Sequence, residues 1–292
     1  FTGCSQEEDA IQVSEKKAIK VVVNMDKPGF GEDTRAPRQG WEANDQVIVA
    51  LNYGSEIYTS GYIKLIYNVT DGKGAWTTEF WEYGGKTSSS DFIDNLYDKF
   101  FTDGSVKAAY FSSGVKSVGI PSLNITTNAS DASLGECVMT CEDGEYSVSG
   151  DVLTLDITMI PQVAQFTIKD LDIADEYSVE YAGTMTAYAG GTITPAGIEL
   201  NPVGEPFEPY GAWVHDNEDG ISIYASPWQG VPDGFDEMDK LETLGGLGYF
   251  LFILYADDNE YYREFPGKDT LKNGDAVIFD GPTTDASKWG VE

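Results

Sequence analysis

Basic residues are scarce in this 292-residue chain, which has 18 Lys and Arg against 49 Asp and Glu and a formal net charge of -31. A surface so rich in carboxylates repels phosphate backbones, which argues against binding of nucleic acid. The same charge repels anionic lipid head groups. Any attachment to a membrane is therefore expected to use acyl chains and not a basic patch.

Histidine is nearly absent, since His215 is the only one. A HExxH zinc site needs two histidines, and the chain has no Gly-x-Ser-x-Gly elbow to supply a serine nucleophile. The acidic stretch 216–220 lacks the spaced ligands of an EF-hand, and residues 245–248 lack the spacing of a dinucleotide-binding loop. We therefore expect no catalysis, metal or cofactor, and we place His215 in a surface loop.

Long apolar runs are also missing. The longest, Tyr249 to Tyr255, is far shorter than the roughly 20 residues that span a bilayer, and it predicts a buried strand. Hydrophobic residues nevertheless make up 41% of the chain and aromatic residues 13%, which is enough for real cores. The length is typical of about two domains.

Three cysteines leave one unpaired after any disulfide. On a single extended strand Cys137 and Cys141 would lie about 13 Å apart, beyond the reach of a disulfide. A turn between them would bring them close enough. The sequence leaves both arrangements open, and Cys4 stands apart from this pair.

Alternating apolar residues predict strands. In the first one, Ala18 to Met25, the side chains of Ile19, Val21, Val23 and Met25 share one face. Further strands are predicted over residues 47–51, 62–69, 75–80, 106–111, 153–159, 166–168, 177–181, 221–225, 249–255, 260–265 and 276–280. One short helix is predicted from Ser90 to Phe101, with Phe92, Ile93, Leu96 and Phe100 on its inner side. This pattern is typical of an all-β protein with a minor helix, built as two tandem antiparallel β-sandwich domains.

The expected organisation is a flexible tether over residues 1–16, an N-terminal sandwich over residues 17–148 and a C-terminal sandwich over residues 149–292. Residues 124–150 are rich in Thr, Ser, Asp and Gly, so they are expected to hold the boundary between the two domains.

Cys4 follows Phe1-Thr2-Gly3 and precedes the acidic run Ser5 to Asp9. The small-small-Cys arrangement resembles the lipobox of bacterial lipoproteins, and the acidic run resembles the export tag of Bacteroidales surface lipoproteins. This resemblance implies that Cys4 carries the lipid and that residues 1–3 are a remnant of a signal peptide. The expected location is the outer face of the outer membrane.

The layout of the chain resembles the fimbrillin family of the Bacteroidales. The resemblance rests on the early strand, Thr34-Arg35-Ala36, Trp41 and Asp45 before Val47-Ile48-Val49, and the Tyr-rich strand before Trp76. It continues through Leu153-Thr154-Leu155, Val163 to Ile168, Leu271 to Asp275, and Trp289.

Membership in that family implies two transthyretin-like β-sandwich domains and assembly into pili by strand donation. A trypsin-like protease would cut after Arg35 or Arg38 and release the strand of Ile19, Val21, Val23 and Met25, leaving a groove. A strand from another pilus subunit would then fill this groove by β-augmentation. The implied partners are other subunits and a ligand on a host or bacterial surface.

Three alternatives stay open, and one of them, a glycoside hydrolase, rests only on the abundance of carboxylates. The first strand could stay in its sheet permanently, as in an anchor or a terminal adhesin. The chain could instead be a glycan-binding outer-membrane lipoprotein of a polysaccharide-uptake system, with Trp81, Tyr83, Trp213 or Trp228 stacking on sugar rings. Asp269-Thr270-Leu271 also resembles the O-glycosylation motif of exported Bacteroidales proteins, with Thr270 as the acceptor.

Overall fold

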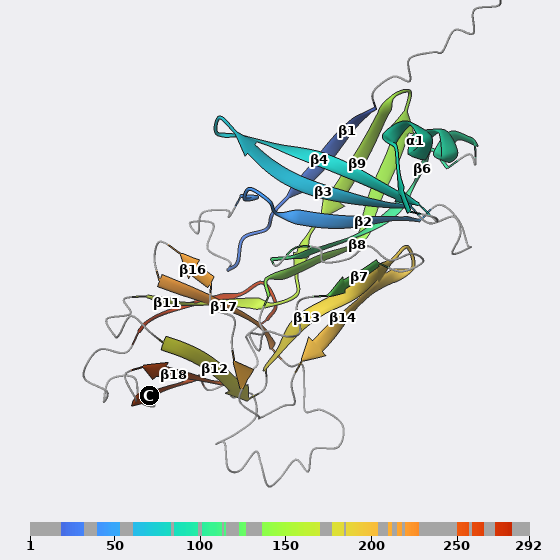
Figure 1. Ribbon diagram of the computed structural model, residues 1–292. Helices are drawn as coiled ribbons and strands as arrows, with labels where there is room; N and C mark the ends of the chain where they lie inside the picture. Colours follow the sequence, from blue (N-terminus) through green and yellow to red (C-terminus); the bar gives the residue numbers. More distant parts are fainter. Residues whose placement is uncertain are drawn as a thin grey trace, which may run out of the picture.

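The structure is a computed structural model and has an all-β fold with one short helix, as the sequence pattern predicts (Figure 1). It describes residues 19–31, 40–52, 61–82, 85–98, 101–112, 114, 123–126, 136–169, 177–183, 185–203, 210–211, 215–217, 220–227, 250–256, 259–265 and 272–281. In this part of the chain no helix is long and apolar enough to cross a membrane.

A nine-stranded sheet contains most of the first half of the chain. Its strands are β1 (Lys20–Asp26), β2 (Gln46–Asn52), β3 (Gly61–Thr70), β4 (Lys73–Glu82), β5 (Gly85–Thr87), β6 (Asp103–Phe111), β8 (Val138–Ser149), β9 (Val152–Thr158) and β10 (Ile160–Pro161). The order is β1-β9-β8-β6-β2-β3-β4-β5, and β10 pairs with β8 outside this path. The first strand therefore lies at one edge.

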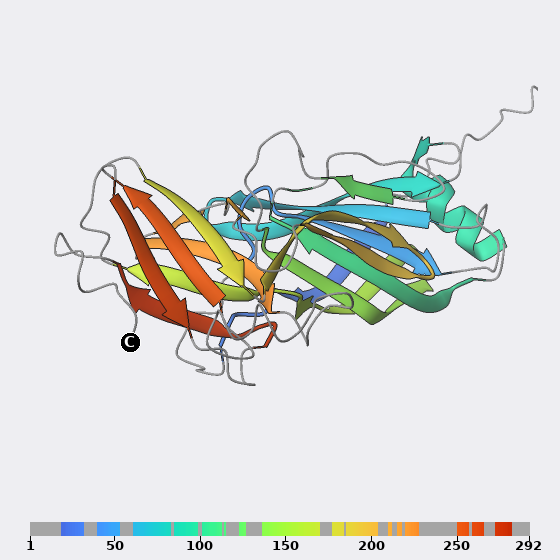
Figure 2. The same cartoon turned by 90° about the horizontal axis from the view of Figure 1, so that it is seen from below.

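Two smaller sheets contain the other strands. The seven-stranded sheet has β7 (Leu123–Thr126), β11 (Ala164–Lys169), β13 (Met185–Thr194), β14 (Gly197–Val203), β16 (His215–Asn217), β17 (Gly220–Pro227) and β20 (Ala276–Asp280). The four-stranded sheet has β12 (Tyr177–Gly183), β15 (Tyr210–Gly211), β18 (Phe250–Ala256) and β19 (Asn259–Phe265). Figure 2 shows these sheets from below.

Most strand pairs are antiparallel, as predicted, but β1 pairs with β9 and β11 pairs with β20 in parallel. The predicted C-terminal domain begins at residue 149 and therefore includes the segment 153–155. In the structure this segment lies in β9, which joins β8 and β1 in the large sheet, whereas the earlier β7 pairs with β13 in the seven-stranded sheet. The division into domains at residue 148 stays a prediction.

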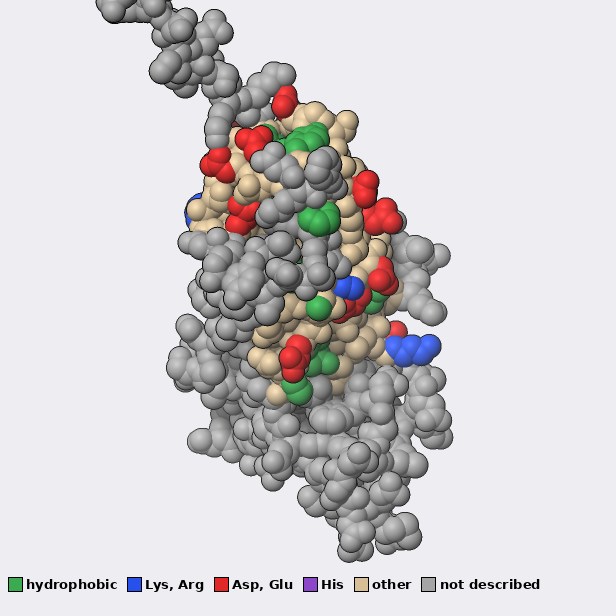
Figure 3. All heavy atoms as spheres, turned by 90° about the vertical axis from the view of Figure 1, so that its right-hand side faces the viewer, with side chains coloured by type: hydrophobic (Ala, Val, Ile, Leu, Met, Phe, Trp, Pro, Cys, Tyr) green, Lys and Arg blue, Asp and Glu red, His purple; other side chains and the backbone are tan. Residues whose placement is uncertain are grey.

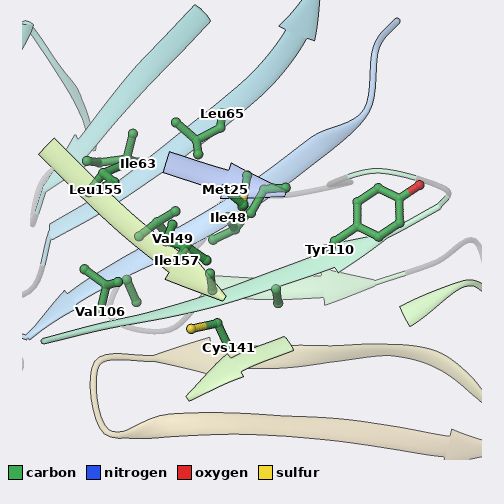
Figure 4. Close-up of a cluster of buried hydrophobic side chains, with 14 of the residues drawn as sticks. Met25, Ile48, Val49, Ile63, Leu65, Val106, Tyr110, Cys141, Leu155 and Ile157 are labelled. Carbon is green, nitrogen blue, oxygen red and sulfur yellow. The ribbon is translucent and has the colours of Figure 1, made fainter. Parts of the chain in front are cut away.

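The core of the large sheet surrounds β2. Its residues Val47 to Leu51 are all fully buried, because β2 lies in the middle of the sheet and both of its faces are covered. The hairpin of β13 and β14 lies against β6 and β8 (Figure 1). Figure 4 shows Leu155 and Ile157 of β9 in the same cluster of buried side chains as Ile48 and Val49 of β2. A continuous apolar run is what such a central strand requires.

The helix α1 (Ser89–Asp98) closes one end of this core. Ser88 caps it, since its Oγ accepts a hydrogen bond from the backbone N–H of Asp91 at 3.1 Å. Phe92, Ile93 and Leu96 are buried, as the helical spacing predicts.

Gly144 in β8 is required by close packing and gives a first prediction. A Cβ on this residue would lie 2.6 Å from Cγ2 of Val106 and 3.1 Å from the carbonyl oxygen of Asp156. Gly144→Ala should therefore lower the free energy of unfolding by about 1–3 kcal/mol. Urea denaturation measures this, and Gly197→Ala is the control because its Cβ would meet nothing within 4 Å. Equal midpoints for the two variants would contradict the prediction.

Candidate functional site: the edge strand β1 and its clamp

The strand β1 forms one edge of the large sheet and, among the strands that the structure describes, pairs with β9 alone. The parallel register runs from Lys20 opposite Val152 to Asp26 opposite Thr158. In that edge position the strand is held by one ladder of hydrogen bonds. Its departure would therefore break this one ladder and leave the other described strands of the sheet paired.

The apolar face of β1 points to the core, as the alternation predicts. Ile19, Val21 and Val23 are partly buried against the core, and Met25 is buried. They lie beside an equivalent row on β9, where Leu153, Leu155 and Ile157 are buried. Figure 4 shows Met25 and Ile157 in this cluster.

A pocket of about 690 Å³ lies at the end of the two strands. It is lined by residues 23–29 and by Ile157, Thr158 and Met159. The edge is thus open to solvent beside the last residues of β1.

Lys27, immediately after β1, is buried and has three interactions. Its Nζ lies 2.9 Å from Oδ2 of Asp45, and the two side chains are 6% and 11% exposed. The same Nζ donates to the hydroxyl of Tyr110 at 3.2 Å, and this hydroxyl donates to Oδ1 of Asp45 at 2.9 Å. The ammonium group also lies over the rings of Tyr110 and Trp41, 4.7 and 5.4 Å from their centroids. We call Lys27, Asp45, Tyr110 and Trp41 the Lys27 clamp.

The Trp41–Asp45 turn positions the acceptor side of the clamp. The Asp45 carboxylate also accepts the backbone N–H of Glu42 at 2.8 Å, and Asn44 has a left-handed φ of 75°, which asparagine tolerates. The indole N–H of Trp41 donates to the carbonyl oxygen of Met25 at 3.2 Å. The Trp41–Asp45 turn, one of the motifs on which the family resemblance rests, therefore holds the end of β1.

Residues beyond the clamp connect β1 to the seven-stranded sheet. Phe30 is 4% exposed, and its ring lies 5.5 Å from that of Tyr224 on β17. The backbone N–H of Gly31 donates to the carbonyl oxygen of Gly274 at 2.7 Å. Gly31 has a φ of 89°, and a Cβ there would lie 3.2 Å from Cβ of Ala276. The segment after β1 is thus fixed on both sheets.

Burial makes the tyrosine hydroxyls and the Cys137 thiol near the Lys27 clamp hard to ionise. It raises the pKa of Tyr110 and of Tyr224 well above the usual value, and neighbouring Cys137 and Asp45 act on Tyr110 in the same direction. Burial likewise raises the pKa of Cys137 to about 12. Burial also raises the pKa of Tyr62 and the pKa of Tyr146, both in the core of the large sheet, to about 12.

These shifts predict alkaline destabilisation. Near pH 10 the unfolded state loses its tyrosine protons, whereas the folded state keeps the protons of its buried tyrosines. The contribution of these tyrosines to the free energy of unfolding is therefore complete below about pH 10 and falls as pH rises above that value. Urea midpoints should therefore fall steeply as pH rises from about 10 to 12. Tyr110→Phe should flatten this slope, and a slope equal to that of the unsubstituted chain would contradict the role of Tyr110.

Cys137 and Cys141 are both free and buried, which answers the question that the sequence left open. Cys141 lies in the extended β8, and no turn brings the two thiols together. No group of three or more His, Cys, Asp or Glu side chains that could hold a metal ion occurs among the described residues.

Several predicted site residues lie outside the part that the structure describes. These are Cys4, Arg35, Arg38, Thr270, Tyr83, Trp213 and Trp228. Trp81 is described and packs against the core of the large sheet, partly buried. The backbone of His215 pairs with Ser222 in the β16–β17 ladder, where a surface loop was predicted.

Sequence reasoning missed Lys27. Its signal was the spacing, because Lys27 continues the every-second-residue series of Val21, Val23 and Met25 in a chain that has few bases. A cation at an inward-facing position calls for a buried carboxylate partner. Asp45 in the turn motif is that partner.

The structural comparisons found proteins from Bacteroides. A fimbrial protein from Bacteroides ovatus matches with a TM-score of 0.42 and 10% identity, over 90% of this chain and 49% of its own. A candidate cell adhesion protein from Bacteroides thetaiotaomicron matches with a TM-score of 0.38 and 9% identity, over 91% of this chain and 93% of its own. A candidate adhesin from Bacteroides ovatus matches with a TM-score of 0.25 and 13% identity, over 97% of this chain and 99% of its own. The structural neighbours are thus fimbrial and adhesin-type proteins.

This chain spans about half the length of the Bacteroides ovatus fimbrial protein. No protein-family model matches the sequence, and the comparison with curated proteins gave no significant match.

Proposed function

We propose that this chain is a non-catalytic cell-surface lipoprotein that acts as a fimbrial subunit or a fimbria-associated adhesin. The observation that carries the proposal is the place of β1 at an edge of the large sheet, in parallel with β9, which is its single partner in the described part of the chain. A parallel edge strand is not half of a hairpin, so its departure breaks one ladder and uncovers one apolar row. The resemblance of the sequence to fimbrillins supports the same conclusion.

Assembly would follow the exchange of β1 for a strand of another subunit. A cut after Arg35 or Arg38 frees the segment that contains β1. The incoming strand then pairs with β9 and covers Leu153, Leu155 and Ile157, which regain the burial that β1 gave them. The partners are other subunits, of the same or a different kind.

The lipid on Cys4 would anchor the chain in the outer membrane, and the acidic residues after it would form a tether. On the face in Figure 3, the described Asp and Glu side chains are scattered over the surface, with few Lys or Arg among them. A high net charge keeps a protein soluble. The proposed ligand of an adhesin lies on a host or bacterial surface.

An arginine-specific protease tests the proposal. The chain has three arginines, Arg35, Arg38 and Arg263, and Arg263 lies in β19 within the β18–β19 ladder. We expect cutting after Arg35 or Arg38, followed by conversion of the monomer into SDS-resistant ladders. Intact mass and denaturing gels over time give the measurement.

The double variant Arg35→Ala with Arg38→Ala should remain monomeric under the same treatment, and Arg263→Ala should form ladders like the unsubstituted chain. A chain that is cut at residue 35 or 38 and stays monomeric would argue against assembly by strand exchange. The glycan-binding alternative gains no support from Trp81, the described member of its four aromatics, because this ring packs against the core.

A further inference from the structure

The groove that β1 fills has an acidic end. Val21, Val23 and Met25 occupy its apolar part, and Lys27 takes the next inward-facing place in the same two-residue period. At that place the groove offers the carboxylate of Asp45 and the rings of Trp41 and Tyr110.

The acidic end is complementary to a cation and to little else. If β1 leaves, Asp45 keeps the hydroxyl of Tyr110 and the backbone N–H of Glu42 but loses its counter-charge. A buried carboxylate without a counter-charge is strongly unfavourable. A strand that ended there in an apolar or acidic residue would leave this penalty in place.

We infer that the groove selects its strand by a cation, and that it accepts an extended segment with three alternating apolar residues followed two positions later by Lys or Arg. In this chain the pattern occurs only at Val21, Val23, Met25 and Lys27. The occupant that replaces β1 is therefore a strand with the same pattern, which in ladders of this chain alone is the β1 of a second copy. This inference rests on the proposed exchange of β1 and names the chemistry of the incoming strand.

Peptide binding to the full-length chain tests the selection. Val21→Asp with Val23→Asp disables the resident β1 while the rest of the chain, including Asp45, is unchanged. The probe is a fluorescent peptide of residues 19–31, and its anisotropy reports binding. We expect this peptide to bind the double variant and not the unsubstituted chain, whose groove is filled.

Substituted peptides then isolate the cation. The K27M peptide should bind at least about tenfold more weakly, and the K27R peptide should bind nearly as well as the unsubstituted peptide. The K20M peptide is the matched control, because it loses the same charge at an exposed residue at the other end of β1. With Asp45→Asn added to the chain, the preference for Lys27 over K27M should disappear. Equal affinities of the K27M and K20M peptides would overturn the inference.

Hydrogen exchange gives a second measurement that needs no vacant groove. In the intact chain, Lys27→Met should speed exchange of the β1 amides at least about tenfold relative to those of β6, and Lys20→Met should leave it within about twofold. Equal exchange in the two variants would overturn the inference even if the groove variant did not fold. The result is separate from the ladder test, since cation selection can hold in a chain that never assembles.

Discussion

Asp45→Ala should lower the free energy of unfolding by about 3–5 kcal/mol. The substitution leaves the Lys27 ammonium group buried, and among the described residues the Tyr110 hydroxyl at 3.2 Å remains as its hydrogen-bond partner. It also removes the acceptor that closes the turn to Glu42. Urea denaturation followed by tryptophan fluorescence measures the loss.

The exposed pair Lys86–Glu79 provides the control. Its Nζ–Oε1 distance is 2.6 Å, but the side chains are 55% and 30% exposed. Solvent screens this pair, so Glu79→Ala should cost less than about 1 kcal/mol. Comparable losses in the two variants would mean that the Lys27 clamp contributes no more than a surface ion pair.

Phe30→Ala should have a similar effect, about 3–5 kcal/mol, through lost packing. The ring is 4% exposed and packs on Tyr224 of the seven-stranded sheet, just before the Gly31–Gly274 hydrogen bond. Truncation leaves a cavity where the segment after β1 crosses between the two sheets. Chemical denaturation measures the loss in stability.

Tyr97→Ala is the comparison, since this aromatic ring on α1 is 38% exposed. It should cost about 1 kcal/mol or less. If Phe30→Ala cost no more than Tyr97→Ala, the residues after β1 would not couple the two sheets, and β1 would be held by its ladder and the clamp alone.

Local patterns predicted the elements and their inward faces. The alternation of Val21, Val23 and Met25 placed these side chains toward the core, and the apolar run Val47 to Leu51 predicted a strand, which the structure shows to be buried. The helical spacing of Phe92, Ile93 and Leu96 predicted the inward face of α1. These features depend on a residue and its near neighbours, which a pattern can reveal.

Pairings between distant strands could not be predicted in this way. A two-residue period says which face of a strand is buried, but not which strand lies beside it. The parallel partner of β1 is β9, so that Asn24 donates a hydrogen bond to Asp156, 132 residues later. The partners of Lys27 and the free state of Cys137 and Cys141 likewise depend on where distant segments meet.

The sequence by itself determined the all-β class, the apolar face of the first strand, and the acidic character that argues against nucleic-acid binding. The tertiary structure alone decided that this strand lies at a sheet edge and that Lys27 after it is buried against Asp45. The physical reason is that burial and charge pairing are properties of the packed whole. Alternation sets the direction of a side chain, but only the packing of distant segments around it decides whether a charge there finds a partner.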